Sequence, residues 1–128
     1  MRIGLHRRLA PPACAVLACL CASTAVYAET TRLSALDLSL MSCGYGIPRA
    51  DLSITEQPLR IGGHAFDHGV GTHADSEFGI DLGSAGVRFT AAVGVDDAAG
   101  DGAPSSLEFV VEGDGRALWR SGPCLQGE

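Results

Sequence analysis

The chain has no lysine, so nine arginines supply all of its basic side-chain charge apart from histidine, against fifteen acidic residues. An acidic surface without lysine repels phosphate backbones, which argues against nucleic acid as a partner. Anionic membrane surfaces are disfavoured for the same reason. Neutral ligands, uncharged sugars among them, carry no such penalty.

Motifs that identify an enzyme are also missing. The sequence contains no G-x-S-x-G elbow and no clear Cys/His nucleophile pair. Carboxylates are plentiful, so a single pair of them is uninformative, because glycoside hydrolysis needs two held about 5–9.5 Å apart around a cleft. We therefore expect a binding module without catalytic activity of its own.

Apolar runs long enough to cross a membrane are absent as well. The run from Ala13 to about Ala22 is shorter than a bilayer core of about 30 Å requires. It follows an arginine-rich start and precedes Val26-Tyr27-Ala28, where small residues occupy the positions read by signal peptidase. The pattern predicts a signal peptide over residues 1–28 and a secreted or periplasmic protein. Cleavage would leave six basic and fifteen acidic residues, a formal net charge of −9.

Only two cysteines remain after that cleavage, Cys43 and Cys124. An exported protein reaches a compartment where disulfides persist, so a Cys43–Cys124 bridge is one interpretation. The alternative is a buried free Cys43 and an incidental Cys124 in an unstructured tail. Sequence alone does not show whether the two Cα atoms lie within the disulfide range of about 4.4–6.8 Å.

Helical periodicity is scarce, and Leu33 to Met41 is the nearest candidate. Alternating apolar residues between glycine-rich turns instead predict short strands. Their spacing is typical of an all-β sandwich. The predicted strands are Leu59–Ile61 before the Gly62-Gly63 turn, Phe78–Leu82, Val87–Val93, Leu107–Glu112, and Ala117–Arg120 after the Gly113-Asp114-Gly115 turn.

These patterns place one domain over residues 29–122 and an unstructured tail over residues 123–128. The final strand runs into a turn at Ser121-Gly122, after which few residues follow. A sandwich that stops on a hairpin leaves an unpaired edge. We therefore expect the sandwich to be incomplete at its C-terminal end, as in a truncated gene product.

From about Leu33 to Ser121 the chain resembles the NPCBM family, a family of carbohydrate-binding modules found beside the catalytic domains of secreted glycosidases, including α-galactosidase-like enzymes. The match follows the order and spacing of many small motifs and covers most of the predicted mature chain. The matching residues are Leu33-Ser34, Leu36, Gly44-Tyr45-Gly46, Asp51, Pro58-Leu59, Ile61-Gly62-Gly63, Gly69 to Ser76, Phe89, Val93 to Asp96, Phe109 to Val111, Asp114-Gly115 and Ser121.

The resemblance implies a jelly-roll-like β-sandwich, similar to galactose-binding domains, that binds galactose-type or related sugars in loops at one end. The chain departs from the family pattern at two places. Tyr45 stands where the family usually has tryptophan, which could alter ligand choice. The family also continues for several strands past Ser121, and this bears on independent folding.

Sugar recognition requires an aromatic face and a few polar groups that bond hydroxyls. Trp119 alternates within a strand and is more often a core residue than a platform. Tyr45 lies between glycines and should project from a turn, whereas His73 could simply cap its loop. The candidate ligand-binding residues are Tyr45, His73, Asp75, Glu77 and Trp119. We expect Tyr45, His73 and Asp75 to cluster about one shallow pocket.

Metal sites are weaker interpretations, and we expect no metal ligands and no cofactor. His64, His68 and His73 lie near Asp67 but lack a standard zinc spacing. The acidic loop with Asp96, Asp97 and Asp101 offers hard oxygens for a structural calcium ion without the EF-hand pattern. Its alternative interpretation is a solvated acidic loop.

The sequence thus predicts a non-catalytic module whose partner is a galactose-type glycan. One alternative is the leading part of a secreted glycosidase, with the catalytic domain as a covalent partner. The other is an adhesion or interaction domain that uses the same sandwich without sugar.

Overall fold

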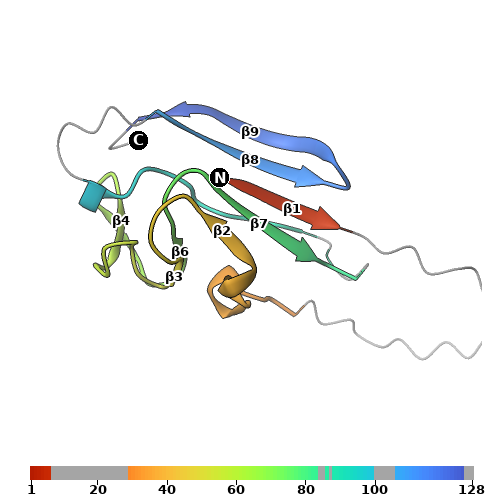
Figure 1. Cartoon of the computed structure of the whole chain (residues 1–128), viewed down its shortest axis with the longest axis horizontal. Coiled ribbons are helices and arrows are strands. Elements are labelled where there is room, and N and C mark those ends of the chain that lie inside the picture. The colour runs from red at the N-terminus through yellow and green to blue at the C-terminus, as the bar shows by residue number, and fades with distance from the viewer. Residues whose placement is uncertain (7–28, 84–85, 87, 100–105, 126–128) are drawn as a thin grey trace, which may run out of the picture.

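The structure is a computed structural model that describes residues 1–6, 29–83, 86, 88–99 and 106–125. Within these ranges every regular element is a strand or a short 3₁₀ turn, as expected for an all-β fold. The largest unit is a five-stranded sheet in the order β2-β7-β1-β8-β9 (Figure 1). Its strands are β1 (Arg2–His6), β2 (Met41–Cys43), β7 (Ser76–Asp81), β8 (Leu107–Gly113) and β9 (Arg116–Cys124).

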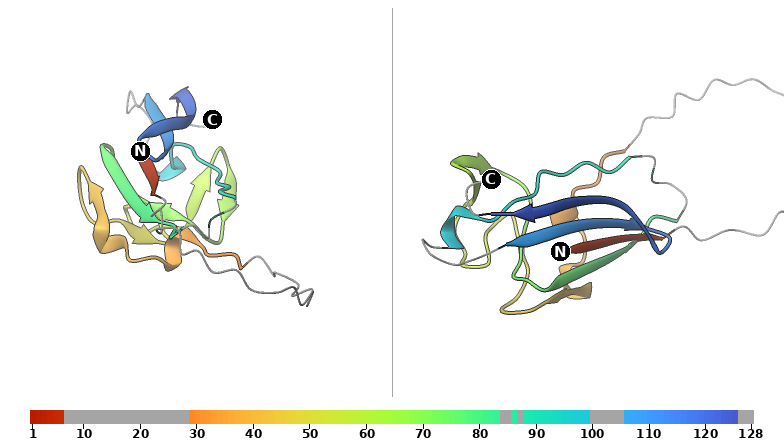
Figure 2. Two further views of the ribbon diagram at one scale, coloured as in Figure 1. Left: turned by 90° about the vertical axis from the view of Figure 1, so that its right-hand side faces the viewer. Right: turned by 90° about the horizontal axis from the view of Figure 1, so that it is seen from above.

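Two short antiparallel ladders lie at the end of this sheet where β1, β7 and β8 begin (Figure 1). One pairs β3 (Arg49–Ala50) with β6 (Val70–Gly71), and the other pairs β4 (Leu59–Ile61) with β5 (His64–Phe66). Together with the sheet they form a sandwich-like all-β domain, seen from two further sides in Figure 2.

Leu33 to Met41, the nearest helical candidate in the sequence, forms two 3₁₀ turns, η1 (Leu33–Ala35) and η2 (Leu38–Leu40), which lead directly into β2. Asp37 caps η2, because its carboxylate accepts hydrogen bonds from the Ser39 amide at 3.0 Å and hydroxyl at 2.6 Å. This local bonding favours a turn over a continuous helix. The third turn, η3 (Asp97–Ala99), lies beside β4.

An apolar row crosses all five strands of the sheet. The strand registers place Met41 opposite Phe78, Phe78 opposite Ile3, Ile3 opposite Val111, and Val111 opposite Trp119. Met41, Phe78 and Ile3 are 6%, 2% and 4% exposed, whereas Trp119 on the edge strand is 47% exposed. The core of the domain therefore centres on the β2, β7 and β1 side of the sheet.

The alternation rule is confirmed for most of the predicted strands. Leu59–Ile61 is β4, Phe78–Leu82 lies within β7 apart from Leu82, and the hairpin around Asp114 joins β8 to β9. The prediction of a strand at Val87–Val93 is wrong for residues 88–93, which have no ladder, and Val87 lies outside the described residues. The position between β7 and β8 in the sheet is occupied by β1 instead.

β1 comes from the first six residues of the predicted signal peptide. It runs parallel to both of its neighbours, in a sheet whose other pairs are antiparallel. Residues 7–28 lie outside the described part of the chain, and cleavage after Ala28 stays a prediction. Within the ranges given above, no helical segment has both the length and the hydrophobicity that crossing a bilayer requires.

At the other end of the chain, β9 continues to Cys124 and pairs Pro123 with Glu108. β9 thus ends two residues beyond the predicted domain boundary at residue 122. Residues 126–128 lie outside the described part. Cys43 and Cys124 are both free thiols. They lie on β2 and β9, the two opposite edges of the sheet, and this separation explains why they do not pair.

Candidate functional site

Two of the predicted sugar-contacting residues meet at one end of the five-stranded sheet. Tyr45 lies in the turn after β2, and His73 lies in the loop between β6 and β7. Their ring centroids are 5.7 Å apart with an interplanar angle of 65°, an edge-to-face contact. Tyr45 is 74% exposed, so one aromatic side chain is held in place while most of it faces solvent. Such a ring can stack on the C–H face of a ligand.

The Cys43 thiol links the two loops that carry these rings. It donates a hydrogen bond to the Tyr45 carbonyl oxygen at 2.9 Å. It accepts one from the Thr72 hydroxyl at 3.3 Å and one from the His73 amide at 3.4 Å. The Gly44 amide adds a bond to the His73 carbonyl oxygen at 3.3 Å. The relative position of Tyr45 and His73 is therefore fixed by the backbones that carry them.

These bonds also act on the acidity of Cys43. Burial is the largest single influence and opposes ionisation, but hydrogen bonds at the sulfur, foremost those from the Thr72 hydroxyl and the His73 amide, outweigh it and lower the pKa of the thiol. Donors that converge on a sulfur atom favour its thiolate form in this way. In the structure the bonds serve to hold the two loops in register.

Gly44 is required by the close approach of the same loops. A Cβ atom at this position would lie 2.6 Å from the Asp75 amide nitrogen and 2.7 Å from the Ala74 carbonyl carbon. Both are backbone atoms, which cannot move aside as a flexible side chain can. His73 is further fixed by its Nδ1, which is 2.6 Å from the Ala74 carbonyl oxygen and must therefore donate to it.

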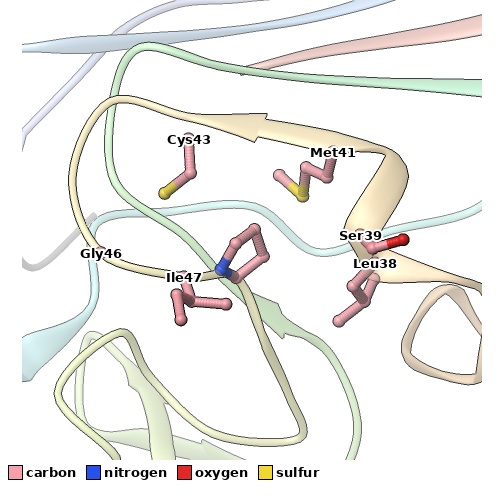
Figure 3. Close-up of a pocket in the computed structure, with 7 residues that line it drawn as sticks. Leu38, Ser39, Met41, Cys43, Gly46 and Ile47 are labelled. Carbon is pink, nitrogen blue, oxygen red and sulfur yellow. The ribbon is translucent and has the colours of Figure 1, made fainter.

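A hollow of about 400 Å³ lies beside the Tyr45 turn. Figure 3 shows Met41 and Cys43 from β2 on one side of it, with Ile47 and Leu38 opposite. Ile47 is 68% exposed, so the hollow carries apolar surface that faces solvent. Its lining residues are Leu38, Ser39, Met41, Cys43, Gly46, Ile47 and Pro48.

Asp75 and Glu77 flank Ser76, the first residue of β7. Asp75 is exposed immediately before β7, and its charge acts on the Met1 amino group. Burial lowers the pKa of the Met1 amino group, and the negative charge of Asp75 acts in the opposite direction. Glu77 pairs in register with Ser42, so its side chain is on the sheet face opposite that of Cys43 and Ser76. It is not grouped with the Tyr45–His73 pair.

Trp119 is the candidate that the fold separates most clearly from the others. It lies on β9, at the edge of the sheet opposite β2. Neighbouring strands are about 4.8 Å apart, so four strand spacings, or roughly 19 Å, separate it from β2. Trp119 therefore cannot join Tyr45 and His73 around one sugar ring.

Several residues of the two metal interpretations have other partners. The His68 imidazole lies 3.4 Å from the Asp51 carboxylate, and residues 1–6, 29–83, 86, 88–99 and 106–125 hold no metal-ligating cluster. Asp97 accepts from the Gly62 and Gly63 amides, both at 2.9 Å. Asp96 accepts from the Arg60 and Ala98 amides. Asp101 lies outside the described residues, so the calcium interpretation remains untested.

Sequence reasoning missed the supports of the site, namely Cys43, Gly44 and Thr72, and the hollow next to it. In the sequence, the Gly44-Tyr45-Gly46 motif does indicate a turn at this place. Nothing local to Cys43 indicates that its partner is a loop thirty residues away.

Comparison with known proteins agrees with the resemblance. The sequence model of the NPCBM/NEW2 domain matches residues 29–128. The chain is 38% identical over 85 residues to Alpha-1,3-galactosidase B of Akkermansia muciniphila, covering 64% of this chain and 10% of that protein. It is 35% identical over 92 residues to a protein of Renibacterium salmoninarum named "Putative endo-alpha-N-acetylgalactosaminidase", covering 67% of this chain and 6% of that protein.

The chain thus spans a tenth or less of the length of these two relatives. No solved structure matches it. The family match covers the whole of the sheet except β1, together with both short ladders and the Tyr45–His73 site. By this match the chain belongs to the NPCBM/NEW2 domain family, a family of non-catalytic modules found in glycosidases.

Proposed function

We propose that this chain binds galactose-type glycans as a non-catalytic module of the exported kind, with Tyr45 and His73 as its main contacts. The observation that carries the proposal is the Tyr45 ring, 74% exposed yet held edge-to-face against His73. Hydrogen bonds at the Cys43 thiol hold together the two loops that carry these rings. The relatives, whose printed names describe enzymes acting on galactose and N-acetylgalactosamine linkages, support this choice of sugar.

The chemistry of the site suits a pyranose ring. The Tyr45 face provides apolar contact, and the His73 Nε2, whose ring partner Nδ1 bonds the Ala74 carbonyl, remains available for a hydroxyl group. The hollow beside the turn provides further apolar surface from Met41 and Ile47. Asp75, two residues from His73, supplies an acceptor at the rim. Few polar groups around an apolar surface are the usual composition of a small-ligand site.

Calorimetric titration with galactose, lactose and galactosyl oligosaccharides tests the proposal. Tyr45→Ala should weaken binding tenfold or more, as truncating a central aromatic contact commonly costs about 1.4 kcal/mol or more. Trp119→Ala is the matched control, because it removes an aromatic side chain from the opposite edge of the sheet and should leave affinity unchanged. Equal losses in both variants, or no binding by the unaltered chain, would contradict the assignment.

His73→Ala separates a ligand contact from a structural cap. We expect it to weaken sugar binding by about 1–3 kcal/mol, the usual cost of a lost polar anchor, and to lower stability by less. Binding is measured by the same titration and stability by thermal unfolding. A variant that melts early and keeps full affinity would show that the histidine is purely structural.

A second candidate is that the chain is the accessory part of a larger secreted glycosidase. The small fraction of each relative that it matches, 10% and 6%, supports this. A reading frame that encodes a catalytic domain directly downstream of the Glu128 codon, in any frame, would favour it. The absence of such a reading frame would contradict this second candidate.

A further inference from the structure

Among the strands that the structure describes, only the central strand of the main sheet lies outside the family match. The matched region is residues 29–128, whereas β1 consists of Arg2–His6. β1 lies between β7 and β8 and is parallel to both (Figure 1). The matched region therefore builds two strand edges that face one gap, and a segment from outside that region fills it.

The backbone of this segment is bonded on both sides. On the β8 side the Val110 amide donates to the Met1 carbonyl oxygen at 2.8 Å, and the Asp114 amide donates to the Leu5 carbonyl oxygen at 2.9 Å. On the β7 side the Leu82 amide donates to the His6 carbonyl oxygen at 3.1 Å. These bonds lie at the ends of continuous ladders that cover Arg2–His6 on one side and Arg2–Leu5 on the other.

Side chains give the gap a preference for particular residues. Ile3 is 4% exposed, between Phe78 of β7 and Val111 of β8. The next residue to either side is not buried, and the Arg2 Nε lies 3.9 Å from a Glu112 carboxylate oxygen. The gap thus buries one apolar side chain, and the Glu112 carboxylate lies at ion-pair distance from the cation next to it, a contact that contributes modestly in solvent.

β7 and β8 cannot close the gap by themselves. With β1 between them they stand two strand spacings apart, or about 9.6 Å, and direct pairing needs about 4.8 Å. Residues 88–94, which follow β7, form no ladder with either strand. Without an occupant, both edges would expose unpaired amides and carbonyls and the apolar surface of Phe78.

We propose that the gap between β7 and β8 is an acceptor site for an extended peptide that lies parallel to both strands, with an apolar third residue and a cationic second residue. Met1–His6 is its occupant within this chain. A segment of that pattern supplied by a separate molecule binds the same site when the chain's own segment is removed. The proposal does not rest on sugar binding.

The test begins with the intact, folded chain. A protease recognition sequence inserted within residues 7–28 allows the folded protein to be cut afterwards. The cut protein is then unfolded in urea, freed of its N-terminal fragment, and refolded with or without a fluorescent peptide of sequence MRIGLH. Fluorescence anisotropy measures binding, and circular dichroism measures strand content. The control is the same peptide with the I3D substitution, which puts a charge at the buried position.

We expect the MRIGLH peptide to bind in a 1:1 ratio, to restore the strand content of the uncut protein, and to compete with the unlabelled N-terminal fragment. The I3D peptide should bind at least tenfold more weakly. The proposal is supported if the protein without its N-terminal fragment recovers its fold only with MRIGLH. It is also supported by a dimer in which a second copy supplies Met1–His6. Absence of peptide binding, whether or not the protein without its fragment folds, or equal binding of the I3D peptide, would overturn it.

Discussion

The five-stranded sheet and the loop end of this domain are held together in different ways. In the sheet, adjacent backbones bond to one another along strands of up to nine residues, and an apolar row packs across them. At the loop end the strands have two or three residues, and carboxylates bond the backbone amides instead. Asp51 accepts from the Gly69 amide at 3.0 Å, and Asp97 accepts from Gly62 and Gly63.

The difference shows where each region draws its stability. Ladders need long, regular segments, and the packed row adds the hydrophobic contribution of burying whole side chains. The loop end has little to bury, so short polar side chains satisfy amides that would otherwise lack a partner. The candidate site lies at the boundary between the sheet and the loop end. Tyr45 and His73 lie on loops, and Cys43 is the last residue of β2.

Removing a side chain from the apolar row should have the largest effect. Phe78→Ala deletes a ring that is 2% exposed, and we expect a loss of about 3–5 kcal/mol in the free energy of unfolding. Trp119→Ala alters the exposed end of the same row and should cost clearly less. Urea denaturation followed by fluorescence or circular dichroism compares them. Similar losses in both variants would mean that the edge of the sheet is as tightly packed as its centre.

Gly44→Ala tests the boundary between the two regions. Its new Cβ would meet the Ala74 and Asp75 backbone, so the loops must separate, at an expected cost of about 1–3 kcal/mol and a loss of the Tyr45–His73 contact. Gly79→Ala is the matched control on β7, because its Cβ meets nothing within 4 Å. Thermal unfolding measures the cost for both. A Gly44→Ala protein as stable as Gly79→Ala would show that the loops are not held closely.

Asp97→Ala tests the polar bracing of the loop end. It removes both acceptors of the Gly62 and Gly63 amides, and we expect a loss of about 1–2 kcal/mol, since exposed amides regain water. Asp67→Ala is the control, because Asp67 is exposed and has no hydrogen-bond or ion-pair partner among the described residues. Hydrogen exchange at Gly62 and Gly63 should quicken in the first variant alone. Unchanged exchange there would exclude the bracing role.

The smallest expected effect is a loss of stability at acidic pH. The Gly69 amide, followed by Ser34 and His68, lowers the pKa of the Asp51 carboxyl below its ordinary 3.8. A depressed carboxyl pKa contributes stability that is present above the unfolded value and is lost as pH falls through the folded value. Thermal unfolding between pH 5 and pH 2 should therefore show a small decline that Asp51→Asn lacks. An identical decline in both proteins would assign it to other carboxylates.

The hairpin around Asp114 and the strands β4 and β7 could be predicted because each depends on neighbours in sequence. Alternation of apolar residues defines a strand locally, and glycines with positive φ, such as Gly62, Gly63 and Gly115, mark the turns. The meeting of Tyr45 and His73 could be predicted only through the family resemblance. The place of Trp119 could not, because alternation gives the face of a strand and not its position in the sheet.

The sequence by itself determined the all-β class, the hairpin, the loops that carry Tyr45 and His73, and the membership of a sugar-binding family, since all of these follow from local periodicity and ordered motifs. Only the tertiary structure decided which segment fills the centre of the sheet. Val87–Val93 alternates as well as any strand here, yet residues 88–93 form no ladder, while Arg2–His6 pairs on both sides. Strand pairing is a competition between segments for the same backbone edges, and its outcome depends on contacts between residues far apart in the chain.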